Sequence, residues 1–236
     1  YVAVKGGSPG TNHAHMDSGS FVLDAEGVRW ALDLGSQSYH GLESRGVNLW
    51  DKTQDSERWT IFRLNNYSHN TLVVDGQLQR VDGNAPIIAF ESDGKAAHTI
   101  VDLTPVYKGQ LAAVSRGVRL VNKTVVIQDE LNALKKPTSV RWAMATQADI
   151  SLDGSAATLK QDGRTLSLRV LAPSDVRLVT YEAENPPMEY DAKNSGTKLL
   201  GFETRLKPGE ASRLTVVMQP GDRMENPPPV TPLAKW

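Results

Sequence analysis

The chain has 236 residues, of which 39% are hydrophobic, and this is enough apolar side chain to build a core at this length. Its 26 basic and 27 acidic residues leave a formal net charge of −1, so we expect neither nucleic acid nor a membrane surface as a partner. There are no cysteines, which excludes disulfides and thiolate metal sites. No apolar run predicts a transmembrane helix, and residues 1–10 lack a signal-peptide pattern. A chain that starts at Tyr1 is expected to be a processed or excised piece.

Short β-strands separated by turn residues are predicted along the chain. Residues 25–27 and the dipeptides Asp75-Gly76 and Asp162-Gly163 are typical turn sequences. Alternation of apolar residues, which places every second side chain on one face, marks the strands between them. The predicted strands are residues 21–24, 28–34, 59–64, 71–74, 118–127, 140–145, 157–160, 165–171, 176–181 and 213–218.

These strands predict an all-β fold, an antiparallel β-sandwich of many strands. No window longer than ten residues has a helical period, and residues 131–136 predict at most one helical turn and a weak boundary. Residues 35–58 are polar and lack alternation, which indicates a long functional loop. We divide the chain into a sandwich domain, residues 1–225, and a proline-rich extended tail, residues 226–236.

Histidines and a carboxylate gather in the first 70 residues. His13 and His15 lie two positions apart and would project to the same side of an extended segment. Asp33 ends an apolar strand, and His69 precedes another. Two neutral imidazoles and a carboxylate suit zinc, with manganese as an alternative. Taken singly, Asp33 could accept a backbone hydrogen bond, and His69 could be a satisfied, half-buried histidine.

Three runs resemble the heparinase II/III-like family of polysaccharide lyases, in the family's order and at similar intervals. They are residues 12–21 (NHAHMDSGSF), 31–35 (ALDLG) and 68–76 (SHNTLVVDG). Residues 116–121 and 125–130 resemble the strands that follow in that family. The resemblance covers residues 5–130 well and the remainder only in its general β character.

The resemblance implies β-elimination across the C4–O bond of a uronic-acid residue, in heparin, heparan-sulfate-like chains or alginate. It implies that His13 is the catalytic residue and that Asn12 orients His13 or binds the uronate carboxylate. His15, Asp33 and His69 would hold a metal with a structural role.

The resemblance further implies an N-terminal (α/α) toroid, as a domain or separate chain, which supplies another histidine and a tyrosine acid/base. It also implies a periplasmic or secreted location. Tyr39 is expected to line the substrate cleft. His40 and His98 match no motif and are expected to be solvated. Ordinary surface or paired roles are expected for the arginines at positions 45, 58 and 63.

Three alternatives remain open from the sequence. A uronyl C5-epimerase removes the same proton but returns it. A non-catalytic carbohydrate-binding sandwich would keep the metal only as a structural element. A metal-dependent hydrolase would need a carboxylate base, for which Asp17 is the nearby residue, although Asp17 is expected to cap a turn.

Overall fold

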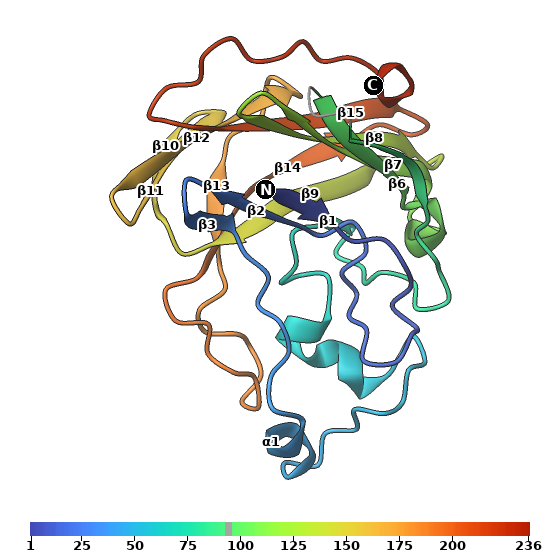
Figure 1. Ribbon diagram of the computed structural model, residues 1–236. Coiled ribbons are helices and arrows are strands. Elements are labelled where there is room, and N and C mark those ends of the chain that lie inside the picture. Colours follow the sequence, from blue (N-terminus) through green and yellow to red (C-terminus); the bar gives the residue numbers. More distant parts are fainter. Residues whose placement is uncertain (93–95) are drawn as a thin grey trace.

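The computed structural model describes residues 1–92 and 96–236 and consists mainly of antiparallel strands (Figure 1). The largest sheet has eight strands, in the order β10-β11-β12-β15-β8-β7-β6-β5. Its strands are β5 (Ile87–Glu91), β6 (Ala96–Asp102), β7 (Leu111–Val121), β8 (Thr124–Ala133), β10 (Asp149–Asp153), β11 (Ala156–Gln161), β12 (Arg164–Ala172) and β15 (Ala211–Pro220).

Two smaller sheets face this large one. The four-stranded sheet has the order β13-β14-β9-β4, and the three-stranded sheet has the order β1-β2-β3. A backbone bridge between Leu32 and Ala145 joins the two small sheets. Their strands are β1 (Val2–Val4), β2 (Phe21–Ala25), β3 (Val28–Ala31), β4 (Leu72–Val74), β9 (Thr138–Thr146), β13 (Val179–Glu182) and β14 (Lys198–Leu206).

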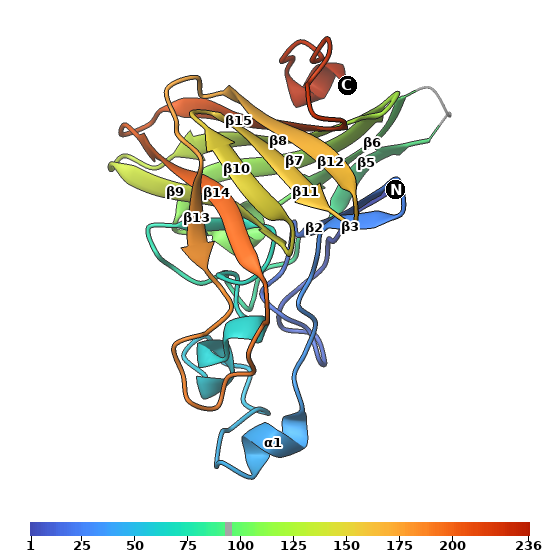
Figure 2. The ribbon, with the colours of Figure 1, turned by 90° about the vertical axis from the view of Figure 1, so that its left-hand side faces the viewer.

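The main core lies between the large sheet and the small ones, as Figure 2 shows from the side. Trp142 of β9 packs between Phe21 of β2 and Phe202 of β14, with ring centroids 6.0 and 5.9 Å apart. From the large sheet, alternate residues of β12 and β15 point into the same core, as period-two burial requires. The predicted antiparallel β-sandwich is confirmed.

Several predicted strands are confirmed, and others differ in their ends. Residues 21–25 and 28–31 form the predicted hairpin, but the second strand stops three residues early, at Ala31. Residues 118–127 are not one strand, because Asn122 (φ +55°) turns the chain between β7 and β8. Residues 131–136 form no helix: β8 continues to Ala133, and a short connection leads to β9.

The prediction of a strand at 59–64 is wrong. This segment forms two short 3-10 helices, η1 (Glu57–Thr60) and η2 (Phe62–Leu64). Ser56 caps η1, because its Oγ accepts a hydrogen bond from the Arg58 backbone N–H at 3.1 Å. The apolar residues of the segment turn inward to a second core instead of alternating across a sheet.

This second core supports a loop lobe, which we define as residues 35–66. The lobe contains α1 (Tyr39–Glu43), η1 and η2 and lies below the sandwich in Figure 1. The buried residues of the second core are Met16, Leu42, Val47, Leu49, Trp59, Ile61 and Leu64. The lobe is also tied to residues 184–194, for example through Gln37 Nε2, which donates to the Tyr190 carbonyl at 2.8 Å.

The C-terminal tail runs across the large sheet and ends in η4 (Leu233–Lys235) (Figure 1). Leu233 is buried, and its backbone N–H donates to Glu130 Oε1 at 3.0 Å. Gln128 Nε2 donates to the Thr231 carbonyl at 2.7 Å.

The remaining helix, η3 (Thr104–Tyr107), connects β6 to β7. Among the described residues, no helix has the length and apolar character needed to cross a membrane.

Candidate functional site

Two of the predicted metal ligands, His15 and His69, lie together where the loop lobe meets the small sheets. Their ring centroids are 5.3 Å apart. His15, Asp17 and His69 each offer one potential ligand atom, and these three atoms lie within 4.8 Å of one another. Residues 54 positions apart in the chain therefore converge on one point.

His69 lies just before β4 and is 0% exposed. Its Nδ1 lies 2.7 Å from Asp33 Oδ2, and its Nε2 has no hydrogen-bond partner among the described residues. A buried ring nitrogen without a partner is costly, so this atom needs a ligand. The donor set of two imidazoles with carboxylates beside them fits a zinc-type cation.

Asp33 follows β3, and its carboxylate is one-third exposed. Its Oδ1 accepts a hydrogen bond from the Gly35 backbone N–H at 2.8 Å, while Oδ2 contacts His69. Burial on its own raises the pKa of Asp33, but the hydrogen bond and charge of His69 and the Gly35 N–H outweigh it and hold the pKa well below its usual range. Asp33 is therefore an ionised carboxylate that fixes the His69 ring.

His15 is held in the neutral form that binds metals. Burial, followed by the charge of His69, lowers the pKa of His15 to about 4. At neutral pH the imidazole therefore keeps a free lone pair, which is the form in which histidine ligates a cation.

Asp17 is a member of the cluster that the sequence reasoning did not include. Its backbone carbonyl closes a turn with Ser20 N–H, but its side chain is buried and pairs with Lys5. Lys5 Nζ donates to Oδ1 at 2.8 Å and to Oδ2 at 2.7 Å. The signal for Asp17 was its position two residues after His15, the same spacing that joins His13 to His15.

His13 is exposed and lies in a turn instead of an extended segment. Its φ is +57°, a left-handed backbone conformation that few non-glycine residues adopt and that is often found at functional sites. Its ring stacks on Tyr39, with centroids 5.8 Å apart and an interplanar angle of 20°. His13, His15, Ser36, Gln37 and Tyr39 line one open hollow of about 430 Å³.

Asn12 is exposed beside His13, and its Oδ1 accepts a hydrogen bond from Lys52 Nζ at 2.7 Å. Tyr39, at the start of α1, is half-buried. Asn12 and His13, two of the residues predicted to act on substrate, thus contact the loop lobe, and His13 does so through the third, Tyr39.

Arg58 holds the backbone between the two histidines, a role that the sequence reasoning missed. The guanidinium is 2% exposed and donates to the carbonyl of Ala14 at 2.9 Å and to that of Leu49 at 3.1 Å. It also lies 3.5 Å from the Tyr39 hydroxyl. The expected surface or paired role is therefore wrong for Arg58, which acts as a positioning residue for His13 and Tyr39.

The other two arginines of the lobe also bind other parts of the chain. Arg63 donates to Asn194 Oδ1 at 2.8 Å and to the carbonyls of Ser36 and Lys193. Arg45 is exposed and donates to the Glu189 carbonyl at 2.8 Å. Both side chains fasten the lobe to residues 184–194.

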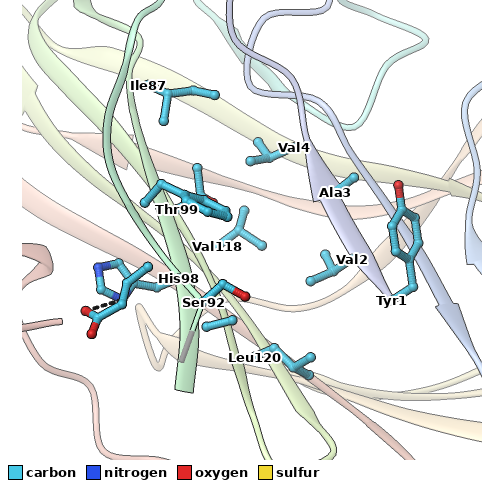
Figure 3. A pocket seen from close by; sticks show the side chains of 13 residues that line it. Tyr1, Val2, Ala3, Val4, Ile87, Ser92, His98, Thr99, Val118 and Leu120 are labelled. Carbon is cyan, nitrogen blue, oxygen red and sulfur yellow. Dashed lines mark ion pairs between the residues drawn. The ribbon is translucent and has the colours of Figure 1, made fainter. Parts of the chain in front are cut away.

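A second hollow lies between β1 and the β5–β6 strands and is lined mainly by apolar side chains (Figure 3). His98 lies at its border, is 9% exposed and has Nδ1 3.9 Å from Glu91 Oε2. The expectation that His98 is solvated is therefore wrong, whereas His40 is exposed as predicted. This hollow contains none of the predicted site residues.

The fold and the site together define a β-sandwich whose loops carry a histidine and carboxylate cluster beside an exposed histidine. A family model described as "Heparinase II/III-like, C-terminal" matches residues 1–196. Because this match covers most of the chain, the chain belongs to the heparinase II/III-like C-terminal family, as its sequence motifs indicated.

Solved structures with the same fold carry heparinase names. The heparinase III product of the gene BT4657 matches with a TM-score of 0.71 and 19% identity, covering 94% of this chain and 33% of that one. The heparan sulfate lyase HepC from Pedobacter heparinus matches with a TM-score of 0.68 and 20% identity, covering 96% and 34%. This chain therefore spans about a third of the length of these structures. A comparison with curated protein sequences found no match.

Proposed function

We propose that this chain is the β-sandwich part of a polysaccharide lyase that cleaves a uronic-acid-containing acidic polysaccharide by β-elimination. The observation that carries the proposal is the placement of His13, an exposed imidazole in a strained turn, two residues from the half-buried His15. Family membership supports the reaction class, and the names of the similar structures support heparin or heparan-sulfate-like substrates, with alginate as the alternative.

The chemistry requires three things of the site. The proton at C5 of the uronic acid must be removed, the adjacent carboxylate must be neutralised, and the leaving oxygen at C4 must be protonated. His13 is exposed and positioned to exchange a proton with substrate or to neutralise its carboxylate. The Asn12 amide, which lies next to it, offers a hydrogen bond to the same carboxylate.

The metal site has a structural role in this proposal. The predicted set of His15, Asp33 and His69 would hold a zinc ion, with manganese as the alternative: the two imidazoles lie together, Asp33 contacts His69 Nδ1, and Asp17 lies beside them. When bound, the ion would link the segments that carry these residues, and so fix the turn that carries His13. The neutral His15, the ionised Asp33 and the unpartnered His69 Nε2 support this assignment.

The complete protein supplies the remaining groups. The proposal includes an N-terminal (α/α) toroid that contributes a further histidine and a tyrosine acid/base, and a periplasmic or secreted location. Both come from the family resemblance, and the greater length of the similar structures is compatible with an additional domain. A hydrolase is less well supported, because both oxygens of Asp17, its required base, already accept hydrogen bonds from Lys5.

The test compares the complete protein with its His13→Ala variant on heparan sulfate and alginate. Unsaturated uronate is followed by its ultraviolet absorbance. We expect His13→Ala to lower kcat by at least ~100-fold, as for loss of a general acid/base, with an unchanged Tm. His40→Ala is the matched control, because His40 is exposed in the same lobe, and it should retain full activity.

Three results would overturn the proposal. The first is that the wild type forms no unsaturated product, and the second is that the His13→Ala variant is as active as the wild type. The third is incorporation of solvent deuterium at C5 without cleavage, which indicates an epimerase. The 236-residue chain by itself is expected to bind metal and to release little or no unsaturated product.

A further inference from the structure

Trp50 is an exposed aromatic side chain that the proposed reaction does not use. It is 54% exposed, whereas Trp30, Trp59 and Trp142 are buried. The indole is nevertheless held in place, since its Nε1 donates to Glu43 Oε1 at 2.9 Å. Its ring meets His13 edge-on, with centroids 6.0 Å apart, and Tyr39 edge-on at 5.8 Å. A large apolar surface is therefore presented to solvent in a fixed orientation next to His13.

Tyr39 is less available than Trp50 for contact with a ligand. One face of its ring is covered by the stacked imidazole of His13, and its hydroxyl lies 3.5 Å from the buried Arg58. Tyr39 thus supports His13 from within the lobe. The aromatic surface that remains open to solvent in this cluster belongs to Trp50.

A cation lies beside this aromatic surface. Lys52, two residues after Trp50, donates through Nζ to Asn12 Oδ1 at 2.7 Å. In the described part of the chain, no carboxylate lies within ion-pair distance of Lys52. The partner of the ammonium is a neutral amide instead of a carboxylate, and Asn12 places it next to His13.

We propose that Trp50 and Lys52 form a sugar-binding subsite beside His13 for a pyranose ring that carries a carboxylate or a sulfate. The C–H face of the pyranose packs on the indole, and the ammonium of Lys52 takes the anionic substituent. The subsite holds the sugar next to the one that reacts at His13. This inference rests on the proposed function for the identity of the ligand as an acidic polysaccharide.

The chemistry of the two side chains explains why both are required. An aromatic face binds sugar rings of many kinds, because it offers dispersion and apolar contact without reading the substituents. A lysine ammonium is a point charge that favours any nearby anion. Together they select an acidic sugar over a neutral one. The hydrogen bond from Trp50 Nε1 to Glu43 already holds the indole, which reduces the entropy lost on binding.

The test measures binding separately from turnover. In the complete protein carrying His13→Ala, which does not consume substrate, the Kd of a defined heparan sulfate oligosaccharide is measured by titration calorimetry. We expect Trp50→Ala to raise the Kd about tenfold or more, Trp50→Phe to restore part of the affinity, and Lys52→Met to raise the Kd about tenfold. Lys52→Met should also reduce the dependence of Kd on salt, because one ionic contact is lost.

Matched controls are present on other faces of the molecule. Phe90→Ala removes an exposed aromatic ring from β5, and Lys160→Met removes an exposed ammonium from β11. Both should leave the Kd unchanged. In the protein with His13 intact, Trp50→Ala should raise KM while kcat on saturating substrate stays within about twofold, which a general loss of folding would not produce.

The outcomes separate the subsite from the reaction. If the wild type forms unsaturated uronate but Trp50→Ala and Lys52→Met bind as the controls do, the subsite is wrong and the reaction stands. If the oligosaccharide binds through Trp50 and Lys52 but no unsaturated product forms, the reaction is wrong and the subsite stands. A wild type that neither binds nor cleaves the oligosaccharide overturns both.

Discussion

The two ring nitrogens of His69 have different surroundings. Nδ1 contacts the Asp33 carboxylate, and Nε2 is buried without a partner among the described residues. This arrangement of carboxylate, imidazole and free ring nitrogen is the one that orients histidines in metal sites. A nearby carboxylate, Asp17, differs from Asp33 because it is already paired with Lys5. The two carboxylates should therefore contribute unequally.

We expect Asp33→Asn to weaken zinc binding ~10–100-fold, the usual cost of losing a carboxylate that orients or supports a metal ligand. Asp17→Asn should weaken zinc binding less, because both Asp17 oxygens already accept hydrogen bonds from Lys5. Competition titration with a chelator, together with elemental analysis, measures both. A larger loss in Asp17→Asn, or a purified wild type that binds no metal, would contradict the proposed metal site of His15, Asp33 and His69.

At the scale of elements, two glycines mark places where backbones or side chains approach closely. Gly201 of β14 pairs with Ala143 of β9, and a Cβ at position 201 would lie 2.1 Å from the Trp142 carbonyl oxygen. Gly117 of β7 lies under the C-terminal tail, and a Cβ there would lie 2.4 Å from Leu233 Cδ2. The first clash is with backbone inside a sheet, and the second is with side chains of the tail, Leu233 and the ring of Trp236.

Gly201→Ala should therefore lower the free energy of unfolding by about 3 kcal/mol, at the upper end of overpacking costs, because neither strand can move without breaking the sheet. Gly117→Ala should lower it by only about 1 kcal/mol, because Leu233 and the tail can shift. Urea unfolding measures both values. The tail of Gly117→Ala should also become more susceptible to proteolysis. Equal losses of unfolding free energy in the two variants would show that the tail is as rigid as the sheet.

For the whole molecule, one buried ion pair connects the large sheet to the site. Arg116 of β7 and Asp129 of β8 are both 0% exposed and form two hydrogen bonds, of 2.7 and 2.8 Å. Arg116 Nη1 also donates to the carbonyls of Gly19 and Asn70. Asn70 follows His69, so the guanidinium fixes the backbone behind the imidazole cluster.

Arg116→Ala should destabilise the protein by about 3–5 kcal/mol, because it leaves the Asp129 carboxylate buried without its partner. Arg119→Ala is the comparison: its guanidinium lies 5.8 Å from the centre of the Trp236 ring, and its loss should cost no more than about 1 kcal/mol. Thermal and urea unfolding of the two variants provide the measurement. Similar losses of stability in the two variants would mean that the buried ion pair stabilises the fold no more than the Arg119–Trp236 contact does.

The sequence by itself determined the features that depend on local spacing. Period-two alternation located most strands, and Asp75-Gly76 and Asp162-Gly163 located turns, because side-chain direction and positive φ are properties of a few consecutive residues. The motif around His13 and His15 identified the family for the same reason: the residue types and their intervals are written in the chain.

Only the tertiary structure decided which side chains are enclosed and what they meet. The 59–64 segment alternates like a strand, but a second core formed with Met16 and Leu42 draws it into 3-10 helices. Arg58 is buried because the carbonyls of Ala14 and Leu49 close around it. Burial and contacts between residues far apart in the chain arise from packing across the whole fold, which no local pattern records.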